Sequence, residues 1–145
     1  MSDTTGGSAL ERGMRLRRQV LGARHVDASG GSDPEAMTPL QRMITEFGWG
    51  TVWAREELAP QQRSLITVAM LIALNRPHEL RVHVRGALRN GLTEAAVREI
   101  AVHAVAYCGF PAAIDASRVI ENVIEQVRAE ADSGPDGSEP PEAES

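Results

Sequence analysis

Two glutamate–histidine pairs are the side chains in this sequence best suited to move a proton. Glu79 stands four residues before His83, and Glu99 stands four residues before His103, with Tyr107 four residues further along. Residues four apart lie on the same face of an α-helix, so each carboxylate could orient or tune the imidazole of its pair. If the two faces meet, they would form one polar pocket able to transfer protons.

Two other interpretations of these pairs stay open. A glutamate and a histidine at this spacing often form only a surface interaction, worth about a few tenths of a kcal/mol. Alternatively, two glutamates and two histidines could bind iron or zinc. Di-iron bundles, however, place Glu and His three residues apart, whereas both pairs here are four apart. The sequence therefore predicts no metal site.

Arginines are the candidate ligands for an anion. Arg63 falls in the first turn of an expected helix, where the helix dipole disfavours a cation unless a carboxylate of protein or ligand lies nearby. Arg85 shares a helix face with Arg81 and Arg89, a row that is ordinarily solvated. Arg55 is a weaker candidate.

Several other side chains have ordinary structural explanations. His25 and His78 are expected at the surface or at helix ends, and Cys108 is expected to be a small core residue. Trp49 and Trp53 could wall a pocket, although core packing or a subunit interface explains them as well.

Composition limits the class of protein. A chain of 145 residues fits one domain, and 3% aromatic residues argue against a β-sandwich or barrel. A net charge of −5 disfavours nucleic-acid binding by a general basic surface, and one cysteine excludes an internal disulfide. No run long enough to span a membrane and no secretory signal is evident, so a cytoplasmic location is expected.

Apolar spacing and helix caps predict an all-α domain of about six helices. The expected helices cover residues 11–24, about 34–53, 60–74, 77–90, 94–107 and 111–129. Around this 11–129 helical domain, we expect a flexible N-terminus over 1–10 and an acidic disordered tail over 130–145. The segment LITVAMLIAL, residues 65–74, is apolar on every side, which favours burial between subunits as well as in the core.

Several stretches together resemble the carboxymuconolactone decarboxylase and AhpD-like family. They are RRQVLGARHVD (17–27), FGWGTVWAR (47–55), WAREELAP (53–60), RSLITVAMLIALNRPHELRVHVRGALRNGLT (63–93) and YCGFPAA (107–113). Alkylhydroperoxidase-type members carry Cys-x-x-Cys with a histidine four residues later. Matching that histidine to His83 places Arg76 and Glu79 at the cysteine positions, so thiol peroxidase chemistry is not expected.

The resemblance implies an AhpD-like helical bundle that forms a homo-oligomer, commonly a trimer or hexamer. It also implies cofactor-free decarboxylation of 4-carboxymuconolactone to 3-oxoadipate enol-lactone. This reaction belongs to protocatechuate catabolism by the β-ketoadipate pathway. The electrons left by CO₂ flow into a dienolate conjugated with the lactone carbonyl, so no metal or cofactor is needed. His83 would donate the proton, Glu79 would tune it, and the arginines would hold carboxylates. The candidate site residues are His83 and Glu79 for catalysis, and Arg63, Arg85, Tyr107 and His103 for substrate binding.

Two alternatives to this function remain. The chain could act on another lactone or enolisable substrate with the same histidine and glutamate, or it could be a non-catalytic helical assembly module in which that pair is only structural.

Overall fold

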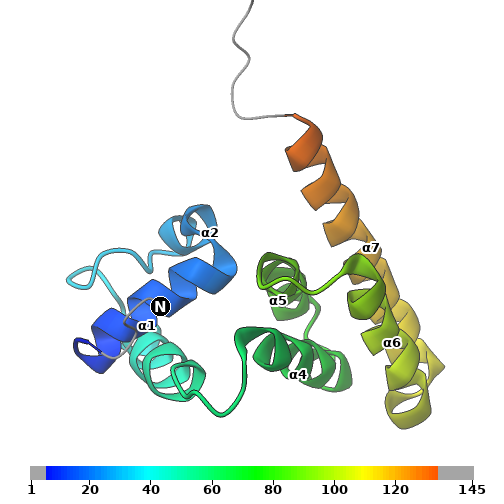
Figure 1. Ribbon diagram of the computed structural model, residues 1–145, viewed down its shortest axis with the longest axis horizontal. Coiled ribbons are helices and arrows are strands. Elements are labelled where there is room, and N and C mark those ends of the chain that lie inside the picture. Colours follow the sequence, from blue (N-terminus) through cyan, green and yellow to red (C-terminus); the bar gives the residue numbers. More distant parts are fainter. Residues whose placement is uncertain (1–5, 134–145) are drawn as a thin grey trace, which may run out of the picture.

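The computed structural model describes residues 6–133, which form seven α-helices and one π-helical segment (Figure 1). They are α1 (Ala9–Leu21), α2 (Ala23–Ala28), α3 (Pro39–Met43), η1 (Ile44–Trp53), α4 (Pro60–Ala73), α5 (Pro77–Arg89), α6 (Glu94–Cys108) and α7 (Phe110–Asp132). No strand occurs in this range, and the expected all-α architecture is confirmed. None of the helices described is both long and apolar enough to cross a membrane.

The first four elements form an N-terminal lobe in which α1 lies against η1. The two backbones touch, because a Cβ placed on Gly13 would overlap the carbonyl oxygen of Thr45. A Cβ on Gly50 would overlap the carbonyl oxygen of Ala9 in the same way. Both contacts require glycine, so the lobe depends on these two close approaches.

Helices α4, α5, α6 and α7 enclose the larger core. Each supplies fully buried aliphatic side chains, among them Val68, Val84, Val97 and Ile120. Burying a side chain of this size contributes about 1.5–3 kcal/mol. Figure 1 shows α5 standing between the N-terminal lobe and helices α6 and α7. One face of α5 therefore belongs to this core, and the other faces the lobe.

A glycine lets α5 approach the lobe closely. A Cβ on Gly86 would lie 3.2 Å from Cγ1 of Val20 in α1. The space at this mid-helix glycine is thus taken by a packed neighbour.

The first expected helix ends three residues early. Gly22 has a φ of 88°, a conformation that favours glycine, and it separates α1 from the short helix α2. The segment after Arg24 was expected to end a helix, and it forms α2 instead. At the other end, the Ser8 hydroxyl accepts a hydrogen bond from the Glu11 N–H, so α1 begins at Ala9, inside the segment expected to be flexible.

The second expected helix begins at Pro39 rather than near residue 34. The Thr38 hydroxyl accepts from the Gln41 N–H at 3.2 Å, and the Gln41 side chain accepts from the Thr38 N–H at 2.9 Å. This capping box starts α3, which passes into the π-helical η1 at Ile44. Apolar spacing did not distinguish π-helical from α-helical turns here.

The later helices follow the sequence closely. Pro60 and Pro77 open α4 and α5, and the Thr93 hydroxyl caps α6. α7 runs to Asp132, slightly past the expected end at 129. Residues 1–5 of the expected flexible N-terminus and residues 134–145 of the expected acidic tail lie outside the described residues, whereas residues 9–10 belong to α1 and residues 130–132 to α7.

Candidate functional site

His83 of α5 lies against two tryptophans of the N-terminal lobe. Its imidazole is 6.1 Å from the Trp49 ring at an interplanar angle of 10°, and 6.4 Å from the Trp53 ring at 25°. The two indoles are themselves 4.8 Å apart. Trp49 is only 5% exposed. These stacked contacts fix the plane of the imidazole from the side of η1.

Local structure explains why these three rings meet. Hydrogen bonds from i to i+5 widen the turns of η1, so residues four apart, such as Trp49 and Trp53, lie on neighbouring turns of one face. α5 starts at Pro77, which places His83 in its second turn, on the side that meets the lobe.

Burial keeps the His83 imidazole neutral in the free protein. Burial, with a smaller contribution from the positive charge of His25, lowers the pKa of His83 from its ordinary 6.5 to about 4. The carboxylate of Glu79 acts in the opposite direction and raises the pKa of His83. A negatively charged ligand would raise this pKa in the same way, so an anionic substrate would favour a protonated His83.

Glu79 is exposed on α5, one helical turn before His83. Among the described residues no hydrogen bond joins its carboxylate to the imidazole, so Glu79 acts on His83 through charge. The indoles, rather than Glu79, set the orientation of the ring.

His25, which was expected at the surface or at a helix end, is half-buried in α2 and lies close enough to His83 to affect its charge. Burial lowers the pKa of His25, and the charges of Arg17, His78 and Arg85 lower it further. His25 also lines an open hollow of about 750 Å³ between the α1–α2 turn, α5 and the end of α7. Sequence reasoning missed this residue, although the stretch RRQVLGARHVD that contains it carried part of the family resemblance.

Arg85 lines the same hollow as His25. Its Nη1 donates to Oε2 of Glu130 at 2.7 Å, and its Nη2 donates to Oε1 of Gln126 at 3.3 Å. A protein carboxylate therefore already occupies the anion-binding edge of this guanidinium.

Arg63 lies in the first turn of α4, at the junction with η1. Its Nη2 donates to the carbonyl oxygen of Arg55 at 2.9 Å. Its Nε is buried and has no hydrogen-bond partner among the described residues. A buried N–H without a partner is unfavourable, so this guanidinium has capacity for an acceptor on a ligand.

The second glutamate–histidine pair lies elsewhere. The rings of His103 and Tyr107 lie 5.1 Å apart at an interplanar angle of 40°. Together with Glu99, these residues line an apolar groove of about 650 Å³ between α4 and α6. Tyr107 is 79% exposed. Within one chain, this groove between α4 and α6 does not include His83. His83 lies on α5 and contacts Trp49 of η1 instead. The expected single pocket of both pairs is therefore not formed by one chain.

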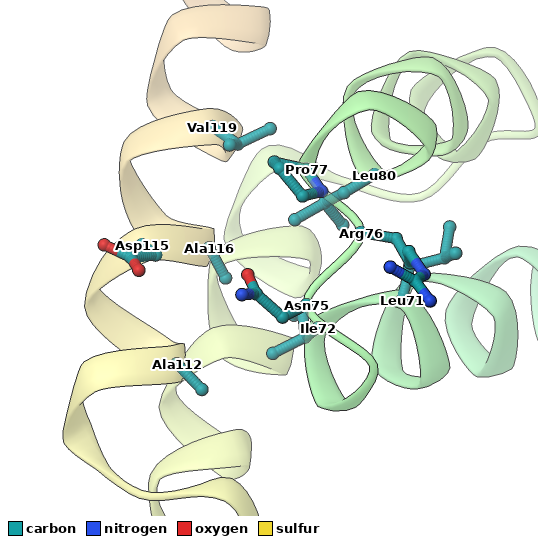
Figure 2. A pocket seen from close by; sticks show the side chains of 10 residues that line it. All are labelled: Leu71, Ile72, Asn75, Arg76, Pro77, Leu80, Ala112, Asp115, Ala116 and Val119. Atoms are coloured by element: carbon teal, nitrogen blue, oxygen red, sulfur yellow. The ribbon is translucent and has the colours of Figure 1, made fainter.

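Neither a metal-ligand cluster nor the small cavity at α7 offers another site in the described residues. Over residues 6–133, no three His, Cys, Asp or Glu side chains gather as metal ligands would. Figure 2 shows a small cavity where Ala112 and Ala116 of α7 face the loop joining α4 to α5. Its volume of about 20 Å³ has room for roughly one water molecule, which is too little for an organic acid.

A model of the Carboxymuconolactone decarboxylase family matches residues 38–122, which include Glu79 and His83. The chain belongs to this family. The resemblance inferred from the sequence is thereby confirmed, and the match begins at the cap of α3 and ends within α7.

Two relatives of known name are similar over most of their length. The nitrosuccinic acid decarboxylase of Metarhizium robertsii is 40% identical over 115 residues, 79% of this chain and 80% of the relative. The 4-carboxymuconolactone decarboxylase of Acinetobacter baylyi is 37% identical over 117 residues, 81% of this chain and 87% of the relative. Both names are those of decarboxylases, which supports a carboxy-lyase activity for this member of the family.

Proposed function

We propose that this chain removes CO₂ from 4-carboxymuconolactone to give 3-oxoadipate enol-lactone, the step expected in the β-ketoadipate pathway, with His83 as the proton donor. The observation that carries the proposal is the partly buried His83 imidazole, which lies against two indoles and has its pKa lowered to about 4 by burial and by the charge of His25. The 37% identity to a 4-carboxymuconolactone decarboxylase supports the choice of substrate.

The chemistry follows from the substrate. The leaving carboxylate stands on a ring carbon conjugated with the lactone carbonyl. When its C–C bond breaks, CO₂ departs and the electron pair moves through the ring alkene to the lactone carbonyl oxygen, which gives a dienolate. A proton then forms the new C–H bond, and the lactone carbonyl is restored. The enzyme must therefore stabilise an oxyanion and deliver one proton to carbon.

The site residues divide these tasks. The negative charge of the bound substrate raises the pKa of His83, so the imidazole takes up a proton from water and can donate it to the dienolate carbon. Glu79 adds negative charge in the same direction. The unpartnered Nε of Arg63 is the candidate donor to a substrate carboxylate or oxyanion. Trp49 and Trp53 exclude water from one side of the imidazole.

Nitrosuccinic acid is the second candidate substrate, because the other similar relative is named for it at 40% identity. Loss of CO₂ from the carbon that bears the nitro group leaves the electron pair on that group, as a nitronate. The same proton donor would then complete either reaction. Assays with both substrates are therefore needed.

The test compares both acids on one preparation. 4-Carboxymuconolactone is generated in situ with a cycloisomerase, nitrosuccinate is supplied directly, and CO₂ release is measured against the spontaneous rate. We expect the lactone to be decarboxylated and His83→Gln to lower turnover by about 100-fold or more. His78→Gln, which removes an exposed histidine of the same helix, is the matched control and should leave turnover unchanged. Acceleration of nitrosuccinate alone would overturn the choice of substrate, and full activity of folded His83→Gln would overturn the role of His83.

We also propose that the chain acts as a homo-oligomer through the groove between α4 and α6. Leu65, Met70 and Tyr107 line this groove and are 44%, 58% and 79% exposed. Large apolar side chains gathered in this way are typical of an association surface. Light scattering should give a multimeric mass that Met70→Glu reduces. Met43→Glu, at an exposed methionine of α3, is the control, and a monomeric wild type or an unchanged mass of Met70→Glu would contradict the proposal.

A further inference from the structure

The hollow that His25 lines carries a surplus of positive charge. Its lining includes the guanidinium groups of Arg24, Arg85 and Arg89, whereas Glu130 is its one carboxylate. Glu130 pairs with Arg85. Within residues 6–133, no acceptor is found for the guanidinium groups of the other two. Like charges on one concave surface repel each other, so the hollow attracts an anion.

The backbone of this hollow is shaped around an arginine. Gly22 has a φ of 88°, and a Cβ placed on it would lie 3.3 Å from the guanidinium carbon of Arg89. The glycine that ends α1 therefore leaves room for the Arg89 head group beside the turn. Arg89 is exposed and lines the hollow beside this turn.

The hollow also adjoins the candidate active site. His25 lines it, and the charge of His25 acts on His83. An anion held by the arginines would thus lie near His25, whose charge acts on His83. The residues of the hollow from α2 and from the end of α7 lie outside the 38–122 match to the family model.

The two candidate substrates share one chemical fragment. In both, the carbon that loses CO₂ also carries a carboxymethyl group, so each contains the skeleton of succinate and keeps one carboxylate after the reaction. They differ in the electron-accepting group, a lactone in one and a nitro group in the other. A site for the retained carboxylate would therefore serve either substrate.

We propose that Arg89 and Arg24 in this hollow bind the carboxylate that the substrate retains, and that the hollow is selective for succinate-like dicarboxylates. The identity of the ligand rests on the proposed function, whereas the existence of the site does not. Guanidinium–carboxylate pairs are strong and often bidentate, so loss of one arginine weakens binding by about 10-fold or more.

Succinate is the probe, because it is the shared skeleton and cannot react. We would titrate the full-length protein with succinate and follow the backbone amide signals by NMR. Signals of Gly22 and Ala23 should shift, and the Kd should rise by about 10-fold in Arg89→Gln and in Arg24→Gln. Arg118→Gln, at an exposed arginine of α7 outside the hollow, is the control and should bind like wild type. Thermal unfolding confirms that each variant is folded, and two variants guard against the failure of one.

The outcomes separate this inference from the proposed function. The protein could bind succinate, with weaker binding in both variants, and yet decarboxylate neither acid. This result supports the site and overturns the proposed function. Decarboxylation with an unchanged Kd and KM in both variants overturns the site alone. Equal weakening by Arg118→Gln would mean a diffuse charge effect, which also overturns it.

Discussion

Acidification should destabilise this protein through His83, by an amount that can be worked out from its surroundings. The pKa of His83 is about 4 in the folded state, against 6.5 for an ordinary histidine. The unfolded chain therefore binds a proton first as the pH falls, and proton uptake favours unfolding. The loss of stability begins near pH 6.5, grows until about pH 4, and is constant below that value.

The magnitude follows from the size of the shift. Each pKa unit corresponds to about 1.36 kcal/mol, so the full effect is about 3 kcal/mol, of which about 2 kcal/mol develops between pH 7.5 and pH 5. The charges that face the ring are His25 from α2 and Glu79 from α5, and both are already included in the pKa of His83. A loss of this size is a large part of the stability of an ordinary domain.

The assay is urea unfolding at one protein concentration, at several pH values between 7.5 and 5. Between pH 7.5 and pH 5, the free energy of unfolding should fall by about 2 kcal/mol more in wild type than in His83→Gln. The comparison uses the pH dependence, so any uniform loss of stability in the variant cancels. His78→Gln, which removes an exposed histidine from the same helix, is the control for replacing a histidine by glutamine. Equal pH dependence in wild type and His83→Gln would refute the argument that burial keeps this imidazole neutral.

Three further predictions concern packing, catalysis and charge. Gly13→Ala should destabilise the fold by about 1–3 kcal/mol in urea unfolding, because its Cβ meets the backbone of η1. Gly48→Ala is the control, because a Cβ there would meet nothing within 4 Å. Equal effects of the two variants would contradict the close approach of α1 and η1. The apparent pKa in the pH profile of kcat/KM should lie below that of kcat, because bound substrate raises the pKa of His83; coincident profiles would contradict this. Glu130→Gln should change the free energy of unfolding by less than about 1 kcal/mol, because its ion pair with Arg85 is exposed on the Glu130 side. It should also tighten succinate binding a few-fold, because Arg85 is then free to bind the ligand. Weaker binding would contradict the charge argument.

Helix ends set by local chemistry were predictable from the sequence. Pro60, Pro77 and Thr93 act within their own turn, so their positions alone located α4, α5 and α6. The break at Gly22 was missed because an isolated glycine is compatible with a helix unless its φ is positive. The π-helical turns of η1 were missed because apolar spacing there fits an α-helix as well.

The candidate site was only partly predictable, for a different reason. His83 and Glu79 share one helix, so their spacing alone suggested their relation. The contacts of His83 with Trp49, Trp53 and His25 join segments far apart in the chain, and no local pattern encodes such pairs. Conversely, His103 and Glu99 repeat the same spacing on α6 but face α4, because the direction of a helix face depends on tertiary packing.

In the proposed mechanism, the partly buried imidazole and the cationic hollow have separate tasks in decarboxylation. A neutral His83 adds no positive charge near the leaving carboxylate before binding, whereas the arginines of the hollow attract the substrate through the carboxylate that it keeps. The bound dianion then raises the pKa of His83, so the proton arrives at the imidazole only once a substrate is present. In this mechanism the contact with the retained carboxylate is made equally in the ground state and the transition state, so it lowers KM, whereas the proton that His83 gains on binding serves the chemical step.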